Sequence, residues 1–220
     1  MNDPIISVHT PKVAGTSFLQ QLKKIYGESK ILLDYNDDPV DVLCRMNIDP
    51  NYYEMNPITS ISPYHVVHGH FHVSKYVQVK NARLITFLRH PIDNVISIYR
   101  YWSALEESVI DNPVFKYFKS NISSIERLAM LPRIRFLYSE SYFGGIDITQ
   151  FDFIGDYSSY DRELMRLSKL LGEKFLPDIR INVTSERENS DEKSLGRDKR
   201  ALLGRILEQD IRFYERYAGR

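Results

Sequence analysis

The segment Ile5–Phe18 constrains the fold of this chain more than any other part of the sequence. It begins with the apolar, β-branched residues Ile5, Ile6 and Val8, which indicate a buried strand. The loop Pro-Lys-Val-Ala-Gly comes soon after this strand and leads into a segment with helical periodicity. Apolar residues at helical spacing then predict a helix, through Phe18, Leu19, Leu22, Ile25 and Tyr26. The segment is therefore predicted to be a strand, a tight loop and a helix.

The chemistry of this loop suits a phosphate group. The first N–H groups of a helix lack intrahelical partners, and the helix dipole adds positive potential at that end. Gly15 lets the backbone approach a ligand closely, and Lys12 adds a mobile positive charge. The order of residues is not that of a Walker A loop, because Lys12 precedes the glycine. An ordinary strand–turn–helix with a solvated lysine is the alternative interpretation.

Size and composition favour one soluble globular domain spanning residues 1–220, and the alternation of strands and helices described below makes it an α/β domain. The chain has 43% hydrophobic and 26% charged residues, which is enough apolar material for a core. Its formal net charge of zero argues against a protein that coats nucleic acid or an anionic membrane. The single Cys44 leaves no internal disulfide and no cysteine-based metal site. With no signal peptide and no apolar run of about 20 residues, we expect no membrane span and a cytoplasmic location.

Further strands and helices are predicted to alternate along the chain. Buried strands are predicted at Arg83–Leu88 and Phe151–Gly155, with shorter ones at Lys30–Asp34 and within Tyr64–Phe71, the latter ending at Gly69. Helices are predicted from Pro91, over Val114–Lys119 and Ile122–Leu131, and through Leu164, Leu167 and Leu171 up to Gly172.

Three segments do not follow this alternation. Residues 35–63 are rich in Asp, Asn and Pro and are predicted to be an irregular insertion with a short helix at Val40–Met46. Ile179–Thr184 is predicted to be extended. Residues 186–200 alternate in charge sign and are predicted to be a loop, followed by one C-terminal helix over 201–218.

Alternating strands and helices predict a central parallel β-sheet flanked by helices on both faces. In such sheets, ligands bind at the carboxyl ends of the strands. Lys12, His68, His70 and Arg89 each lie at or after the end of a predicted strand. We therefore expect these four side chains to gather along one edge of the sheet.

Arg89 and Ser97 form a second candidate for phosphate binding. Arg89 closes the strand at Arg83–Leu88, and Ser97 lies eight residues later, about two turns along the next helix. A guanidinium group can bind a phosphate through paired N–H bonds, and a hydroxyl group can add another. Arg89 could instead form a structural salt bridge, and Ser97 could be a plain surface residue.

His68-Gly69-His70 is the third candidate element. Two histidines could bind a metal, but no third ligand is visible in the sequence. A histidine near its usual pKa is the common proton acceptor for a hydroxyl group. A packed histidine bonded to the backbone is the alternative for each. The other histidines are interpreted as structural or solvated, namely His9, His65, His72 and His90.

These three elements, in this order, resemble the sulfotransferases that use 3′-phosphoadenosine 5′-phosphosulfate (PAPS), most closely the uronyl or heparan sulfate 2-O-sulfotransferase branch. The resemblance covers Ile5–Trp102 well and Phe151–Leu171 loosely. It implies a P-loop-kinase-like sulfotransferase fold and transfer of a sulfuryl group from PAPS to an acceptor hydroxyl, on a carbohydrate or glycoconjugate. The sequence departs from the family pattern at two positions. His90 stands where Asp is common, and Asn94 stands where a second Arg is common.

The resemblance also implies roles for individual residues. His70 would be the catalytic base, with His68 as a supporting or alternative base, and no metal would be needed. Arg89 and Ser97 would hold the 3′-phosphate. The 5′-phosphosulfate would be held by the loop residues Lys12, Ala14, Gly15, Thr16 and Ser17, with Lys12 also stabilising the leaving group.

Two other classes of protein are consistent with the same residues. A nucleotide kinase or NTPase with a divergent loop would need a Mg²⁺-binding acid at a strand end, for which Asp156 is the candidate. A non-catalytic nucleotide-binding protein would bind 3′-phosphoadenosine 5′-phosphate (PAP) and transfer nothing. The sequence does not indicate the acceptor, the oligomeric state or a role for Arg187.

Overall fold

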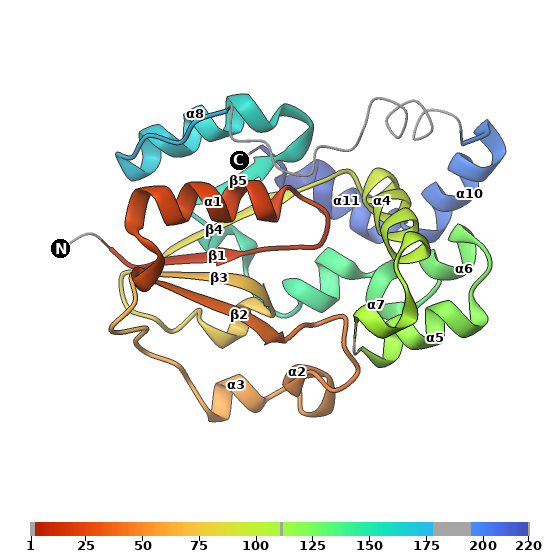
Figure 1. The fold of residues 1–220 in the computed structure, drawn as a ribbon, viewed down its shortest axis with the longest axis horizontal. Coiled ribbons are helices and arrows are strands. Elements are labelled where there is room, and N and C mark those ends of the chain that lie inside the picture. Colours follow the sequence, from red (N-terminus) through yellow and green to blue (C-terminus); the bar gives the residue numbers. More distant parts are fainter. Residues whose placement is uncertain (1–2, 111, 178–194, 220) are drawn as a thin grey trace.

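The computed structural model describes residues 3–110, 112–177 and 195–219. At its centre is a five-stranded sheet with the strand order β2-β3-β1-β4-β5, in which all four neighbouring pairs are parallel (Figure 1). Because the strands are parallel, their carboxyl ends meet at one edge of the sheet. The strands are β1 Ile5–Val8, β2 Ile31–Asp37, β3 Val66–Phe71, β4 Arg83–Leu88 and β5 Phe153–Asp156.

The helices connect these strands and extend beyond them. The described α-helices are α1 Gly15–Tyr26, α2 Arg45–Ile48, α3 Tyr52–Met55, α4 Pro91–Ala104, α5 Pro113–Asn121, α6 Ile125–Ala129, α7 Pro132–Arg135, α8 Tyr160–Leu171, α10 Arg197–Ile206 and α11 Glu208–Tyr217. A π-helical segment covers Leu137–Tyr142, and short 3-10 turns cover Glu28–Lys30, Val73–Lys75, Glu107–Val109, Ile148–Gln150 and Tyr157–Ser159.

Helices cover both faces of the sheet. Alternate strand residues point to opposite sides, so each face contributes its side chains to a separate core. Ile5, Ile85 and Phe153 belong to a core that contains side chains of α1 and α8, two helices that lie on the same side of the sheet in Figure 1. Their neighbours Ile6 and Leu84 belong to a second core, which contains side chains of α4, α5, α6 and the π-helical segment. The predicted fold class, a parallel sheet with helices on both faces, is confirmed.

Several predicted boundaries were wrong. The strand expected to end at Gly69 continues to Phe71, so His70 lies within β3. The short helix expected at Val40–Met46 begins only at Arg45, as α2, and the described insertion also contains α3. The C-terminal region forms two helices, and α10 already begins inside the predicted charged loop, at Arg197. Ile179–Thr184, Arg187 and the rest of that loop up to residue 194 lie outside the described residues.

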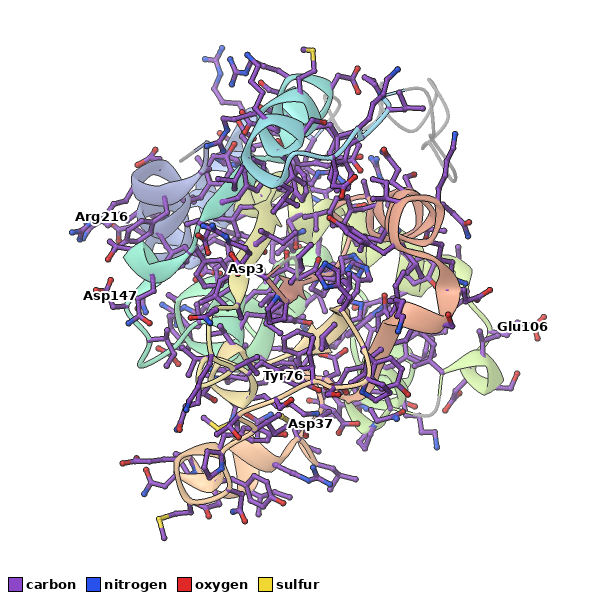
Figure 2. The ribbon with its side chains drawn as sticks, turned by 90° about the vertical axis from the view of Figure 1, so that its left-hand side faces the viewer. Asp3, Asp37, Tyr76, Glu106, Asp147 and Arg216 are labelled. Carbon is purple, nitrogen blue, oxygen red and sulfur yellow. The ribbon has the colours of Figure 1, made fainter. Side chains whose placement is uncertain are left out.

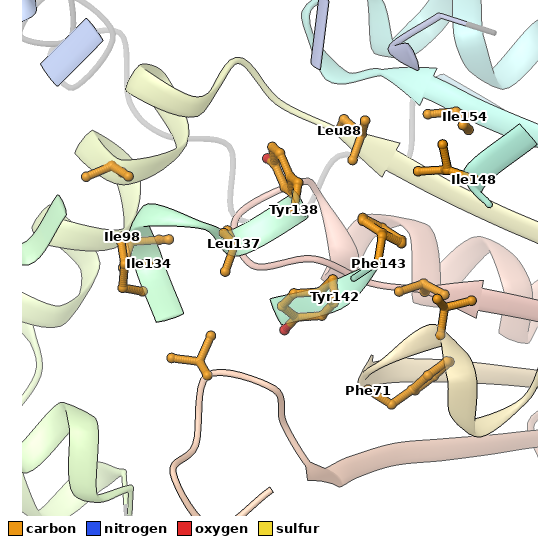
Figure 3. Packing of buried hydrophobic residues seen from close by; sticks show 14 of the residues in the cluster. Phe71, Leu88, Ile98, Ile134, Leu137, Tyr138, Tyr142, Phe143, Ile148 and Ile154 are labelled. Atoms are coloured by element: carbon orange, nitrogen blue, oxygen red, sulfur yellow. The ribbon is translucent and has the colours of Figure 1, made fainter. Parts of the chain in front are cut away.

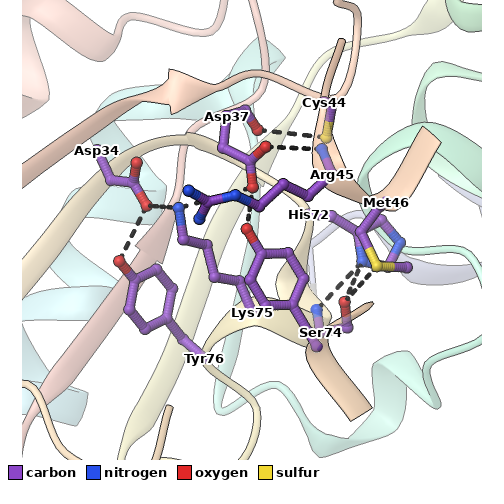
Figure 4. Close-up of polar contacts among 10 residues, drawn as sticks. Asp34, Asp37, Cys44, Arg45, Met46, His72, Ser74, Lys75 and Tyr76 are labelled. Atoms are coloured by element: carbon purple, nitrogen blue, oxygen red, sulfur yellow. Dashed lines mark hydrogen bonds and ion pairs between the residues drawn. The ribbon is translucent and has the colours of Figure 1, made fainter. Parts of the chain in front are cut away.

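A buried ion-pair network attaches the insertion to the sheet (Figure 4). The Lys75 ammonium lies 2.7 Å from Asp34 Oδ2 and 3.7 Å from Asp37 Oδ2. Tyr76 donates to Asp34, and Tyr53 of the insertion donates to Asp37. In Figure 2, Asp37 and Tyr76 lie near each other beside the insertion.

The charges in this network depend on one another. Burial would raise the pKa of Asp37, but the hydrogen bonds from Tyr53 and the Arg45 N–H, with the charge of Lys75, hold that pKa below its usual value. A buried ion pair that loses one partner leaves an uncompensated charge in a poorly solvated position. Among the ion pairs of the described residues, Lys75 is the only positively charged side chain that pairs with Asp34 and Asp37.

We predict that Lys75→Met lowers the free energy of unfolding by about 3–5 kcal/mol, because Asp34 and Asp37 stay buried without their cation. The matched control is Lys80→Met at an exposed lysine, which should change stability by less than about 0.5 kcal/mol. Urea unfolding followed by circular dichroism measures both. Equal stability of the two variants would show that the network does not hold the insertion.

Candidate functional site

A cleft of about 1350 Å³ opens at the edge of the sheet where the strands end. It is lined by the loop after β1, the start of α1, one side of α4 and the residues that follow β5. Three neighbouring central strands each supply a predicted residue: β3 carries His70, β1 precedes Lys12 and β4 precedes Arg89. The other predicted residues in the lining are Ala14, Gly15, Thr16, Ser17 and Ser97, and His68 is absent from it.

The loop between β1 and α1 has an unusual backbone conformation. Lys12 and Ala14 have φ angles of 62° and 60°, in the left-handed region that non-glycine residues rarely adopt. Each such residue costs of order 1 kcal/mol, so the surrounding structure must hold it in place. Two side chains do so. The Asn94 amide donates to the Pro11 carbonyl at 2.7 Å, and Arg89 Nη1 donates to the Lys12 carbonyl at 3.3 Å.

Arg89 is itself fixed by residues from much later in the chain. The Tyr138 hydroxyl accepts a hydrogen bond from the Arg89 N–H at 3.2 Å and donates to the Arg89 carbonyl at 2.9 Å. The Tyr138 N–H donates in turn to the buried Asp210 of α11 at 2.8 Å. Figure 3 shows Tyr138 beside Leu88, the last residue of β4. Through Tyr138, α11 therefore helps to position the backbone of Arg89.

The two cationic side chains line the same cleft and face aromatic rings. The Lys12 ammonium lies 4.1 Å from the centre of the Tyr101 ring, and the Arg89 guanidinium lies 5.0 Å from that of Tyr157. The N-terminus of α1 has no side-chain cap and lines the same cleft. This combination of cations and a helix N-terminus can bind an anionic ligand.

Ser97 faces this cleft from α4. The sequence placed Ser97 on the side of the helix away from its apolar face, and the structure confirms that arrangement. Ser97 is nevertheless buried, with 8% of its surface exposed, although it lies in the lining of the cleft. Its hydroxyl is therefore suited to a ligand that enters the cleft.

His70 is supported by a chain of hydrogen bonds. Its Nδ1 lies 2.8 Å from the Tyr142 hydroxyl, which donates to Asp38 Oδ1 at 3.1 Å. Asp38 Oδ1 also accepts the Val40 N–H at 2.9 Å, so this oxygen acts as an acceptor. Because the Tyr142 proton points to Asp38, the network assigns the His70 proton to Nδ1. The lone pair on Nε2 is then suited to accept a proton.

Burial lowers the pKa of His70 to about 4 and raises the pKa of Tyr142 well above its usual value. Burial also raises the pKa of Asp38. At neutral pH, His70 is therefore an uncharged imidazole and Tyr142 keeps its proton. This state is the one that a general base requires.

The other two histidines of this region have different surroundings. His68 is buried, and its Nδ1 lies 2.9 Å from the Ser7 hydroxyl, so the structure does not place it where an acceptor could reach it. His9 was interpreted as structural or solvated, yet it lines the cleft, with its ring centre 4.6 Å from that of His70. A Cβ atom added to Gly15 would lie 1.8 Å from the His9 ring.

The sequence did not reveal the residues that support the site. Asp38 lies in the irregular insertion, and Tyr142 and Tyr138 lie in a segment for which the sequence predicted no helix or strand. No local pattern marks any of them, because their contacts join positions 49 to 104 residues apart. Asn94 was noted only as a departure from the family pattern, whereas it holds the loop at Pro11.

The described residues contain no group of three or more His, Cys, Asp or Glu side chains arranged to bind a metal ion. The stacked rings of His9 and His68 lie nearly parallel, at 12° to each other. Asp156, the candidate magnesium ligand, accepts hydrogen bonds from Ser158 and from the Tyr214 hydroxyl and does not line the cleft.

Within the described parts of the chain, no helix has the length and apolar character needed to cross a bilayer.

Comparison with known proteins finds no matching family model and no matching curated protein. Several solved structures are similar at low identity. A mouse sulfotransferase, SULT7A1, complexed with PAP shares 15% identity over 88% of this chain and 65% of that chain, so this chain spans less than two thirds of it, with a TM-score of 0.38. A sulfotransferase from Alicyclobacillus acidocaldarius shares 11% identity over 94% of this chain and 97% of that chain, with a TM-score of 0.40.

The sulfotransferase domain from the curacin biosynthetic pathway shares 12% identity over 81% of this chain and 77% of that chain, with a TM-score of 0.37. Similarity at these levels is too low to assign a family or an activity. What the cleft can do must therefore be argued from its own residues.

We predict that Gly15→Ala lowers the free energy of unfolding by about 1–3 kcal/mol, because the added methyl group would collide with the His9 ring. The matched control is Gly204→Ala in the interior of α10, where no atom lies within 4 Å of the added methyl group. The Gly204→Ala control should be more stable than the unaltered protein by roughly 0.5–1 kcal/mol, since alanine favours the helix. Urea unfolding of both variants checks the prediction, and a Gly15→Ala variant as stable as the control would contradict it.

Proposed function

We propose that this protein is a PAPS-dependent sulfotransferase that moves a sulfuryl group to the hydroxyl of an acceptor. One observation carries the proposal. Lys12 and Arg89 follow adjacent strands and line one cleft, and His70 from the strand on the other side of β1 lines the same cleft. PAPS has two anionic ends, a 5′-phosphosulfate and a 3′-phosphate. A cleft with two separate cationic groups and a neutral base suits such a donor and a hydroxyl acceptor.

The donor would be held at both ends. Lys12 and the uncapped N-terminus of α1, with Ala14, Gly15, Thr16 and Ser17, would bind the 5′-phosphosulfate. Arg89 and the Ser97 hydroxyl would bind the 3′-phosphate. Arg89 also donates to the Lys12 carbonyl, so the two binding groups are mechanically connected. This connection would fix the distance between the two ends of the nucleotide.

PAPS supplies the sulfuryl group and is released as PAP. In the transfer, a bond forms between the acceptor oxygen and sulfur, and the bond between sulfur and the bridging phosphate oxygen breaks. The proton of the acceptor hydroxyl goes to Nε2 of His70, which the hydrogen bond to Tyr142 leaves unprotonated. Lys12 and the N–H groups at the start of α1 would stabilise the negative charge that develops on the departing phosphate oxygen.

The resemblance noted in the sequence makes a carbohydrate or glycoconjugate hydroxyl the expected acceptor. The alternatives are less well supported by the geometry. A kinase or NTPase would use an acid such as Asp156, which instead bonds Ser158 and Tyr214. A protein that only binds nucleotide would have no use for the hydrogen-bond chain from Asp38 through Tyr142 to His70.

We predict that Lys12→Ala and Arg89→Ala each weaken PAP binding by about 10- to 100-fold, since each removes a charge-assisted contact to a phosphate. Lys24→Ala and Arg205→Ala are the matched controls, because both residues are exposed and neither lines the cleft. Isothermal titration calorimetry with PAP measures all four affinities. Unchanged affinity in both Lys12→Ala and Arg89→Ala would defeat the assignment of the donor site.

We predict that His70→Asn keeps PAP affinity but lowers the rate of sulfate transfer by about 10²- to 10⁴-fold, the usual contribution of a general base. His65→Asn, a histidine outside the cleft, is the control. Transfer from radiolabelled PAPS to a panel of hydroxyl compounds provides the rates. Normal turnover by His70→Asn would remove this residue from its role.

Because the pKa of His70 is lowered to about 4, kcat/KM of the unaltered protein should stay level from pH 7 to pH 5 and fall only below pH 5.

A further inference from the structure

His9 and His70 lie side by side on one face of the sheet. Val8, at the end of β1, pairs with Gly69 of β3, and the His9 N–H donates to the Gly69 carbonyl at 2.9 Å. His9 therefore stands opposite His70, the next residue of β3. Since side chains alternate along a strand, His9 projects on the same face as Ile5, which is the face that α1 covers.

The His9 ring contacts both the proposed base and the loop proposed to hold the donor. Its centre lies 4.6 Å from the centre of the His70 ring. Its Cε1 and Nε2 atoms would lie only 1.8 Å and 1.9 Å from a Cβ atom added to Gly15, the first residue of α1. Gly15 thus leaves just enough room for the imidazole. One ring therefore joins the donor loop to the base.

Packing holds the His9 ring in place. Both ring nitrogens are buried, and neither has a hydrogen-bond partner among the residues that the structure describes. His68 stacks on the ring, with the ring centres 5.1 Å apart and the planes at 12°. Tyr35 meets it edge to face at 6.3 Å. A side chain that forms no hydrogen bonds acts through the volume of its ring, so the nitrogens of His9 are not what the site uses.

Aromatic rings from three separate segments surround His70. Besides His9 at the end of β1, the ring of Tyr35 from β2 lies 5.0 Å from His70, and that of Tyr142 from the π-helical segment lies 6.3 Å from it. These rings keep water from much of the imidazole, although His70 still lines the cleft. A cavity left beside polar groups takes up water, so removal of the His9 ring would hydrate the base.

Burial, and not a neighbouring charge, keeps His70 uncharged. The titratable and charged groups around it are His9 and Lys12 from β1 and its loop, Tyr35 from β2, His68 from β3, Asp38 from the insertion and Tyr142 from the π-helical segment. Burial also lowers the pKa of His9 and His68 well below the usual value, so both are uncharged. Burial is the cause that lowers the pKa of His70 to about 4. Whatever keeps water from this ring therefore keeps it ready to accept a proton.

We infer that His9 is a positioning residue, whose ring keeps water away from His70 and fixes this base against the loop that would hold the 5′-phosphosulfate. The inference rests on the proposed sulfotransferase function and adds a residue to its machinery. His9 acts through His70 and Gly15, because both of its nitrogens are buried. A side chain of similar volume without nitrogens should therefore replace it, whereas a small side chain should not.

The first experiment follows the titration of the His70 imidazole by NMR in the full chain without nucleotide. In the unaltered protein, His70 should stay uncharged from pH 7 to pH 5. His9→Ala removes the ring and should raise the midpoint by at least about one pH unit, toward the ordinary histidine value of about 6.5. His9→Leu, which restores the volume without nitrogens, should titrate like the unaltered protein. His65→Ala, at a histidine outside the cleft, is the matched control.

The second experiment measures sulfate transfer and PAP affinity in the same variants. In His9→Ala, kcat/KM should already fall between pH 7 and pH 5, because His70 then becomes charged in that range. Its kcat at pH 7 should be lower by up to about 100-fold, since the base is no longer fixed against the donor loop, while PAP affinity by calorimetry stays unchanged. His9→Leu should recover both the pH profile and kcat. If His9→Ala fails to fold, His9→Val, which also lacks the ring, takes its place.

The outcomes separate this inference from the function on which it rests. An unchanged His70 titration in His9→Ala would show that the ring does not shield the base. A His9→Leu variant as impaired as His9→Ala would show that the nitrogens act and not the ring volume. Either result would overturn the role of His9 and leave the donor site standing. Absence of PAP binding by the unaltered protein would instead overturn the proposed sulfotransferase function, which the titration without nucleotide does not depend on.

Discussion

The candidate site depends on how the loop between β1 and α1 is held against the end of β4. This loop contains two residues with left-handed backbone conformations, which an isolated peptide would not keep. Asn94 and Arg89 hold it by donating to two consecutive carbonyls, those of Pro11 and Lys12. The same contacts tie the Lys12 backbone, a few residues before the start of α1, to the Arg89 guanidinium. A single pair of side chains thus shapes the loop and joins the two cationic parts of the cleft.

Residues from the second half of the chain make this arrangement rigid. Tyr138 binds both backbone groups of Arg89 and is itself held by Asp210, while Tyr142 links His70 to Asp38. Both tyrosines come from the π-helical segment, which packs against α11 and α7. The binding groups therefore come from the first half of the chain, and much of their support comes from the second. A fragment ending after α4 would lack these supports.

Local patterns in the sequence predicted the elements that carry the binding groups. The apolar runs at β1 and β4 and the helix beginning at Pro91 were each identified, because alternation, β-branching and proline position act over a few residues. The supports of the site could not be predicted in this way. The partners of Asp38 and Tyr138 lie 104 and 49 residues away, and no periodicity marks either residue. The position of His9 could not be predicted for the same reason, since only the folded sheet brings its ring beside His70.

The central claim is that one nucleotide occupies the cleft with its two anionic ends at two connected cationic groups. A crystal structure of the protein with PAP tests this claim most directly. The account predicts the 5′-phosphate at the N-terminus of α1 beside Lys12 and the 3′-phosphate within hydrogen-bond distance of Arg89 and Ser97. PAP bound elsewhere on the molecule, or in the reverse orientation with its 3′-phosphate at Lys12, would contradict it.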